Sequence, residues 1–199
     1  IKPDYAEAYY NMSVALNDKG DLEAAIESYK QALKIKPDYA QAYNNMGNIQ
    51  KNKGDLEAAI ESYKKAIKIK PDYAQAYNNM GNIQKEKGDL DAAISSYKRA
   101  LKIKPDYALA YYNMGNIQKE KGDLDAAISS YKQALKIKPD WAEGYCDLGV
   151  ALLLLNKTEQ ALVSYEKAIS LKKDFNAAIS GLGNVLLKKG EHSEGLDKL

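Results

Sequence analysis

Apolar residues recur three or four positions apart along most of the chain, in blocks that repeat every 34 residues. Prolines mark the period, standing at Pro3, Pro37, Pro71, Pro105 and Pro139. The segments 71–104 and 105–138 differ only at Gln75 against Leu109, Asn78 against Tyr112 and Arg99 against Gln133. A fixed period of this length is typical of a stacked array of similar structural units.

Each period predicts two helices, and the second period illustrates the first of them. Asp38 follows Pro37 and is placed to cap this helix, with Gln41 three residues on to complete a capping box. The helix is expected to continue to about Lys53.

The second helix of the period has clearer boundary signals. Gly54 supplies a left-handed stop for the preceding helix, and Asp55 is placed to cap the next one. That next helix is predicted from about Leu56 to Ile69, and Pro71 ends it.

The repeated pattern is very similar to the tetratricopeptide (TPR) repeat, and the similarity covers nearly the whole chain. Positions are counted from the alanine after each Pro-Asp-Tyr. Position 4 carries Tyr9, Tyr43, Tyr77, Tyr111 and Tyr145. Position 8 carries Gly47, Gly81, Gly115 and Gly149. Position 24 carries Tyr29, Tyr63, Tyr97, Tyr131 and Tyr165.

The resemblance implies an all-α fold, a right-handed αα-superhelix (solenoid) of 34-residue helix pairs. We expect one array over residues 1–199, with repeats at about 6–39, 40–73, 74–107, 108–141 and 142–175 and a partial sixth at 176–199. Because both ends fall inside the repeat pattern, the chain is expected to be a piece of a longer array.

Several recurring residues are expected to serve the scaffold. Most tyrosines stand at positions where the family packs its core, which favours packing over ligand stacking. Gly47, Gly81 and Gly115 are expected to let paired helices approach closely, which offsets the poor helix propensity of glycine. Gln50 and its equivalents depart from the usually apolar position 11 and are expected at the core edge with a hydrogen-bond partner.

Asparagines form two rows on one face of the first helix of each repeat. Positions 6 and 9 lie three residues apart and so share a helix face. Position 6 carries Asn11, Asn45, Asn79 and Asn113, and position 9 carries Asn48, Asn82 and Asn116. In TPR proteins this face lines the concave groove, and the position-6 row is similar to the asparagine ladder of O-linked N-acetylglucosamine transferases, which grips a peptide backbone.

An amide side chain offers both a donor and an acceptor, so it can bind a peptide unit with little dependence on sequence. We therefore take these asparagines, with Tyr10 and Tyr112 beside them, as candidate peptide-binding residues. The alternative is that they are solubilising residues on an unused groove. TPR domains that hold chaperone C-terminal carboxylates use Lys or Arg at positions 2, 5 and 6, and this chain has none there.

The fifth repeat changes character. Val150 replaces the position-9 asparagine, and Leu153 and Leu154 stand where earlier repeats carry lysine and a polar residue. Leu187 continues the trend. Exposed apolar clusters mark interfaces, so these four residues are a candidate apolar interface for a ligand side chain, for a missing downstream segment, or for self-association through the C-terminal end.

Composition narrows the function further. The chain has 199 residues, 28% charged, with a net charge of +2, which gives no electrostatic argument for nucleic acid or a membrane surface as partner. Cys146 is the single cysteine and His192 the single histidine, so neither a disulfide, a metal-ligand spacing nor an activated nucleophile is evident. We predict no catalysis, no cofactor and no metal. The compartment is left open, with the cytoplasm favoured.

The sequence therefore predicts a protein–protein interaction module that binds an extended peptide or protein segment. Two alternatives accompany this prediction. One is an assembly scaffold that associates end to end. The other is a non-catalytic, substrate-presenting domain of a larger transferase-type enzyme.

Overall fold

A computed structural model describes residues 4–190, so His192 and the end of the partial sixth repeat lie outside the described residues. These residues form eleven helices and no strand. The helices are α1 (Asp4–Asp18), α2 (Leu22–Ile35), α3 (Ala40–Asn52), α4 (Leu56–Ile69), α5 (Ala74–Glu86), α6 (Leu90–Ile103), α7 (Ala108–Glu120), α8 (Leu124–Ile137), α9 (Ala142–Leu154), α10 (Thr158–Leu171) and α11 (Asn176–Lys189).

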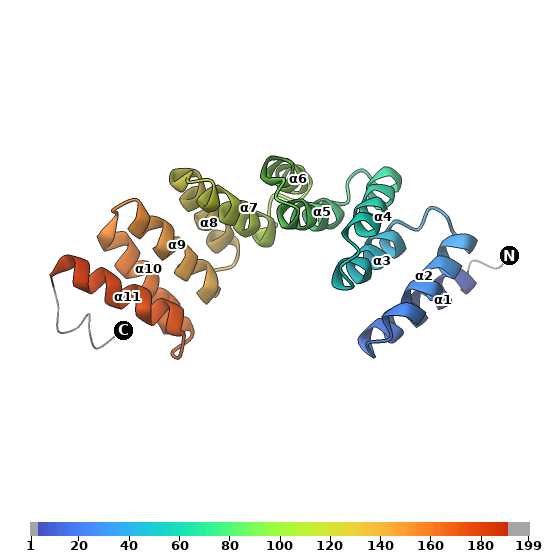
Figure 1. The fold of residues 1–199 in the computed structure, drawn as a ribbon, viewed down its shortest axis with the longest axis horizontal. Coiled ribbons are helices and arrows are strands. Elements are labelled where there is room, and N and C mark those ends of the chain that lie inside the picture. Colours follow the sequence, from blue (N-terminus) through green and yellow to red (C-terminus); the bar gives the residue numbers. More distant parts are fainter. Residues whose placement is uncertain (1–3, 191–199) are drawn as a thin grey trace. The chain divides into compact units, whose positions relative to one another are not determined.

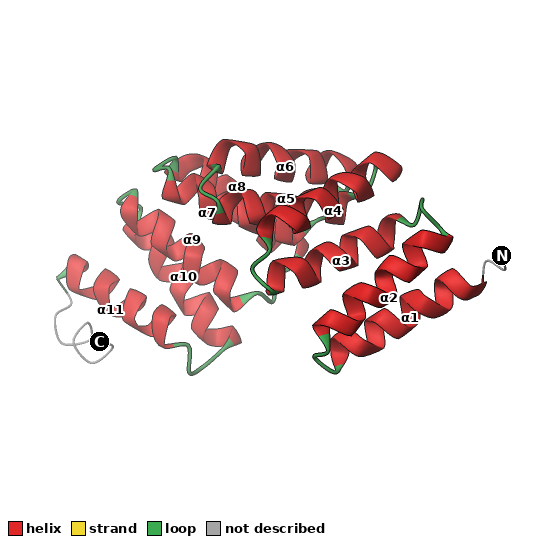
Figure 2. Ribbon diagram, turned by 45° about the vertical axis from the view of Figure 1, so that its right-hand side comes forward, coloured by secondary structure: helices red, strands yellow, loops and turns green. Residues whose placement is uncertain are grey.

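Consecutive helices pack as pairs joined by short turns, which confirms the predicted all-helical repeat fold (Figure 1, Figure 2). In each complete pair, the first helix is called helix A and the second helix B. The described chain divides after Lys104 into two compact units. The first unit holds α1–α6 and the second holds α7–α11. None of the described helices is both long and apolar enough to cross a membrane.

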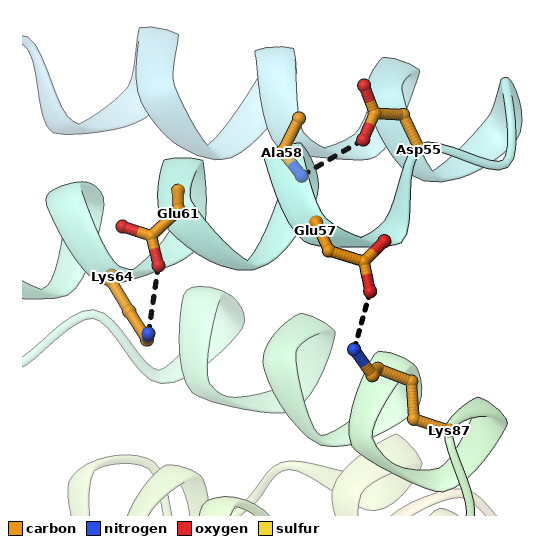
Figure 3. Close-up of polar contacts among 6 residues, drawn as sticks. All are labelled: Asp55, Glu57, Ala58, Glu61, Lys64 and Lys87. Carbon is orange, nitrogen blue, oxygen red and sulfur yellow. Dashed lines mark hydrogen bonds and ion pairs between the residues drawn. The ribbon is translucent and has the colours of Figure 1, made fainter.

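The turn inside each pair follows the predicted chemistry. Gly54 adopts φ +82°, a left-handed conformation that glycine reaches without a Cβ penalty. The Asp55 side chain then accepts a hydrogen bond from the Ala58 N–H at 3.1 Å, which caps α4 (Figure 3). The same arrangement begins α2, α6 and α8. In the fifth repeat Asn156 takes the positive φ, 57°, and Lys157 precedes α10 without a side-chain cap.

The predicted cap of helix A is wrong. Helix α3 begins at Ala40, one residue later than a cap by Asp38 requires, and Tyr39 at its N-terminus makes no side-chain cap bond. The turn after Pro37 is closed by backbone bonds instead, from Tyr39 N–H to Lys36 O at 3.3 Å and from Ala40 N–H to Asp38 O at 3.1 Å. The proline turn therefore places Asp38 too far upstream to reach the first helical N–H groups.

In the second to fifth repeats, the core is a tyrosine of helix B packed against a glycine of helix A. Tyr63 is completely buried, and a Cβ on Gly47 would lie 2.7 Å from Cε1 of its ring. Gly81 stands in the same relation to Tyr97, and Gly149 to Tyr165, at 2.7 and 2.9 Å. In these repeats glycine lets the paired helices approach closely, as the sequence predicted, whereas the first repeat carries Ser13 at this position.

Ion pairs join successive repeats at their outer turns. Lys87, at the C-terminus of α5, contacts Glu57 at the start of α4 at 2.6 Å (Figure 3). Lys53 contacts Glu23 in the same way, and in the second unit Lys157 contacts Asp125 at 3.1 Å. These side chains are largely exposed, so each pair contributes little to the stability of the fold.

The Gly–Tyr contact is tested by Gly81→Ala. The added methyl group meets a buried ring that cannot move freely, which costs roughly 1–3 kcal/mol, while the helix propensity gained returns about 1 kcal/mol. We expect a net loss of up to about 2 kcal/mol in the free energy of unfolding, measured by urea denaturation with far-UV circular dichroism. Ser95→Ala on the exposed side of α6 is the control and should stay within about 0.5 kcal/mol of the parent. A Gly81→Ala chain that is about 1 kcal/mol more stable than the parent, which is the full gain in helix propensity, would contradict the packing argument.

Candidate functional site

The asparagines of the first unit lie together on α3 and α5. Asn45 and Asn48 come from α3, and Asn79 and Asn82 from α5; each is half-buried. The face formed by these four residues is called the amide face. Because positions 6 and 9 recur unchanged in both repeats, the two helices present the same amides one repeat apart.

Hydrogen bonds connect the amide face from one repeat to the next. Asn45 Nδ2 donates to the Tyr10 hydroxyl at 2.9 Å, and Asn79 Nδ2 donates to Asn44 Oδ1 at 3.1 Å. In both cases position 6 of one repeat bonds to position 5 of the repeat before. Asn44 itself is completely buried and also donates to Asn45 Oδ1 at 3.2 Å. The position-6 row is therefore part of the scaffold as well as of the surface.

The position-9 asparagines hold the buried tyrosines. Tyr63 donates its hydroxyl to Asn48 Oδ1 at 2.7 Å, and Tyr97 donates to Asn82 Oδ1 at 2.8 Å. In the second unit Tyr131 donates to Asn116 Oδ1 at 2.8 Å. Burial raises the pKa of the Tyr63 hydroxyl, which keeps it protonated as a donor.

The predicted residues of the second unit meet different partners. Tyr112 on α7 donates its hydroxyl to Asp147 Oδ2 at 2.6 Å, and its ring lies against Trp141, with ring centroids 4.4 Å apart. Lys119 contacts the other oxygen, Oδ1 of Asp147, at 2.6 Å. Asn113 is half-buried on α7. Asn11, on α1 in the first unit, is exposed.

Sequence reasoning missed Asp147 and Asn44 as members of these networks, and it missed the burial of Asn78. Asp147 occupies position 6 of the fifth repeat, so the register itself placed a carboxylate in the asparagine row. Asn44 and Asn78 occupy position 5, the position that carries Tyr10 in the first repeat and Tyr112 in the fourth. Their burial depends on the helix packed beside them, which periodicity alone does not show.

Two of the lysines at position 12, Lys51 and Lys119, form ion pairs. Lys51 contacts Glu86 of the next repeat at 2.9 Å. Because the charges within this pair and within the Lys119–Asp147 pair cancel, the two pairs leave little electrostatic field to select a charged ligand.

The glutamines at position 11 also have hydrogen-bond partners. Gln50 accepts from the Ser62 hydroxyl at 2.6 Å, as predicted.

Two hollows open along the amide face of the first unit. One, of about 140 Å³, is lined by Asn48, Lys51, Asn52, Tyr63, Asn79 and Asn82. The other, of about 200 Å³, is lined by Val14, Asn17, Tyr29, Asn45, Asn48, Ile49 and Asn52. Asn48 and Asn52 line both, so the two hollows are neighbours on one surface.

The candidate apolar interface of the fifth repeat is only partly exposed. Val150 and Leu153 pack against the core cluster of the second unit. Leu187 is partly buried on α11, whereas Leu154 is 60% exposed. Its role as an interface stays a prediction.

The described residues hold no cluster of His, Cys, Asp and Glu side chains that could bind a metal ion. Cys146 is buried on α9, and burial, followed by the charge of Asp147, raises the pKa of its thiol to about 11. A thiol with a raised pKa is a poor nucleophile at neutral pH.

Comparison with known families settles the class of the protein. A family model described as "TPR repeat" matches residues 14–54, 47–88, 81–122 and 115–156, and one described as "Tetratricopeptide repeat" matches residues 142–175. The chain belongs to the tetratricopeptide repeat family. The TPR fold is that of a protein–protein interaction module, and TPR proteins bind protein or peptide partners.

Solved TPR structures share this fold. MamA is 28% identical, with a TM-score of 0.75 over 86% of this chain and 94% of that one. PilF of Pseudomonas aeruginosa is 16% identical, with a TM-score of 0.86 over 98% and 89% of the two chains. YrrB, described as a TPR protein with an unusual peptide-binding site, is 24% identical, with a TM-score of 0.70 over 86% and 88%. The last two comparisons show the fold alone. Comparison with curated proteins gives no match.

The tyrosine–asparagine bond is tested by Tyr63→Phe. Removing the hydroxyl deletes the bond to Asn48 Oδ1 and should lower the free energy of unfolding by about 0.5–1.5 kcal/mol. Tyr165→Phe is the matched control, because Val150 stands at position 9 in the fifth repeat and the substitution removes no bond of this kind. Equal losses in the two variants, measured by urea denaturation, would show that the asparagine bond adds nothing.

The state of Cys146 is tested by its reactivity. With a pKa near 11, the folded chain holds roughly 100-fold less thiolate at pH 8 than an ordinary cysteine, and burial slows access further. Alkylation by iodoacetamide, followed by mass spectrometry, should therefore be at least about 100-fold slower in the native chain than in urea. Equal rates would mean that this thiol is exposed and available for chemistry.

Proposed function

We propose that this TPR chain binds an extended segment of a partner protein on its amide face, through hydrogen bonds to the backbone of that segment. The proposal rests on the hydrogen-bonding atoms of Asn48 and Asn79 that the bonds within the scaffold do not use. The confirmed TPR fold supports the general class, and the sequence-predicted asparagines supply the specific contacts.

The scaffold uses opposite ends of these two amides. Asn48 Oδ1 accepts from the Tyr63 hydroxyl and from Asn79 Nδ2, at 2.7 and 3.0 Å, and neither bond involves Asn48 Nδ2. Asn79 Nδ2 donates to Asn44 and Asn48, and neither bond involves Asn79 Oδ1. Asn48 and Asn79 both line the hollow of about 140 Å³, and we infer that the donors of Asn48 on α3 and the acceptor of Asn79 on α5 face it.

This pairing matches a peptide group. Every non-proline residue of a bound segment offers one C=O and one N–H, which are complementary to Asn48 Nδ2 and Asn79 Oδ1. Both asparagine side chains are already held by the scaffold, so little side-chain entropy is lost when a ligand binds. The sequence predicts ligand contacts mainly at position 6. The hydrogen bonds instead favour position 9 as the source of the donor to the ligand and position 6 as the source of the acceptor.

The neighbouring hollow supports a side-chain site next to the backbone site. Val14 and Ile49 give it an apolar wall, and Asn45 and Asn48 give it polar atoms. Burial raises the pKa of the Tyr29 hydroxyl in this hollow to about 12, so the phenol stays neutral. A small or medium-sized apolar side chain of the bound segment fits this lining, while the adjacent peptide group lies against Asn48 and Asn79.

The first test selects ligands from a phage-displayed library of random 12-residue peptides. Backbone recognition predicts binders with varied side chains, and N-methylation of a single central peptide bond should weaken the best binder at least about tenfold. Fluorescence anisotropy with a fluorescein-labelled peptide measures both. A library without binders, or binders indifferent to N-methylation, would contradict backbone recognition.

The residue test is Asn48→Asp. A carboxylate still accepts from Tyr63 and Asn79, so the scaffold bonds are kept, but the two N–H donors toward the hollow are lost. We expect peptide affinity to fall at least about tenfold with little change in stability. Gln133→Glu, on the exposed side of α8, makes the same amide-to-acid change elsewhere and should leave affinity unchanged. Unchanged affinity in Asn48→Asp would remove this residue from the binding site.

The alternatives from the sequence predict other results. An end-to-end scaffold predicts a particle size that grows with protein concentration in sedimentation measurements, without peptide capture. A substrate-presenting domain predicts the same peptide capture as the present proposal, so it concerns the parent protein and leaves the binding site unchanged.

A further inference from the structure

A third hollow lies in the second unit. It measures about 340 Å³ and is lined by Lys132 of α8, by Leu148 and Leu152 of α9, and by Glu159, Gln160, Val163 and Ser164 of α10. This feature is called the apolar hollow. On helix A its lining positions, 7 and 11, lie roughly 150° around the helix from positions 6 and 9, which carry the amides in other repeats.

The apolar hollow exists because the fifth repeat departs from its predecessors at this place. In the second, third and fourth repeats a glutamine at position 11 accepts from a serine at position 23, at 2.6 Å each time. Leu152 replaces that glutamine, and the Ser164 hydroxyl bonds back to the Gln160 carbonyl oxygen at 2.8 Å. A polar contact between the paired helices thus becomes an apolar surface.

Position 22 changes in the same repeat. Earlier repeats carry Glu27, Glu61, Ser95 and Ser129 there, and the fifth carries Val163, which is 62% exposed. The floor beneath it, formed by Leu148 and Leu152, is buried at 6% and 1% exposure. The first repeat also has a leucine at position 11, but its position 22 is acidic. Apolar residues at both positions therefore occur together only in the fifth of the five complete repeats.

Charge at the rim indicates which occupant fits. Glu159 is paired with Lys189 at 3.5 Å, so its charge is largely neutralised. Lys132 is exposed and forms no ion pair within residues 4–190. The uncompensated charge at the rim is positive, which favours a ligand that carries a carboxylate beside its apolar group.

We propose that the apolar hollow is a second docking site, which receives one large apolar side chain from an acidic segment of a partner protein. The volume of about 340 Å³ is enough for a leucine, phenylalanine or tryptophan side chain. Leu148, Leu152 and Val163 contact that side chain, and Lys132 contacts a neighbouring aspartate or glutamate of the same segment. The site is independent of the amide face, so the chain engages partners on two separate surfaces.

The test uses the same random 12-residue phage library against the 199-residue chain. Clones that lose binding to Asn48→Asp belong to the amide face and are set aside. Among the remainder, we expect binders that combine one large apolar residue with an adjacent Asp or Glu. Their affinity should fall roughly 10- to 100-fold in Val163→Ser, which restores the residue of the third and fourth repeats. It should fall several-fold in Lys132→Glu, and this loss should shrink at high salt.

Two further variants make the result decisive. Leu152→Gln with Val163→Ser rebuilds the surface of the fourth repeat, and Ser164 is in place to donate to the new amide. If that double variant unfolds, Val163→Ser alone still tests the apolar hollow, because it leaves the buried floor of Leu148 and Leu152 intact. Ser95→Ala on α6, at the equivalent position 22 of the third repeat, is the control and should bind as the parent does.

Either of two outcomes would overturn the proposal. One is a set of binders that bind the parent, Val163→Ser and Lys132→Glu equally well. The other is a parent chain that self-associates in sedimentation equilibrium while Val163→Ser stays monomeric, since the occupant would then be a second copy of this chain.

Discussion

The fold depends on one contact that recurs in the second to fifth repeats, in which the ring of a helix-B tyrosine lies directly on a glycine of helix A. Tyr63 on Gly47 and Tyr97 on Gly81 bring the paired helices so close that no Cβ fits between them. Burying the ring also buries a hydroxyl, and a buried hydroxyl without a partner is costly. The asparagine one residue after each of these glycines provides that partner, which explains why glycine and asparagine recur together in a helix that neither favours.

The amide face is a consequence of this requirement. Asn48 accepts from Tyr63 and Asn79 through its oxygen, and neither bond uses its N–H donors. Asn79 has the complementary arrangement, because its N–H donors bond to the preceding repeat. A network that satisfies the scaffold therefore leaves a donor and an acceptor on one surface. In the proposed function, stability and recognition use opposite ends of the same side chains.

In the fifth repeat, no asparagine stands at position 9 to bond the buried tyrosine hydroxyl. Val150 stands in place of the asparagine, and a carboxylate, Asp147, stands in the position-6 row, where Tyr112 and Lys119 hold both of its oxygens. Leu152 removes the polar contact between the paired helices and opens the apolar hollow. The two units therefore offer different surfaces, neutral and amide-rich in the first, apolar with a positive rim in the second.

The sequence by itself determined the period, the helix pairs, the glycine stops, the capping aspartates and the face on which the asparagines lie. These follow from local rules, because helical periodicity and turn chemistry act within a few residues. The cap predicted for Asp38 was wrong because the proline turn shifted the start of the helix. Only the tertiary structure decided which atom of each amide is used, that Asn44 is buried, and that Leu148, Leu152 and Val163 surround a hollow. Those features join residues of neighbouring helices, and their geometry is set by how closely the helices pack.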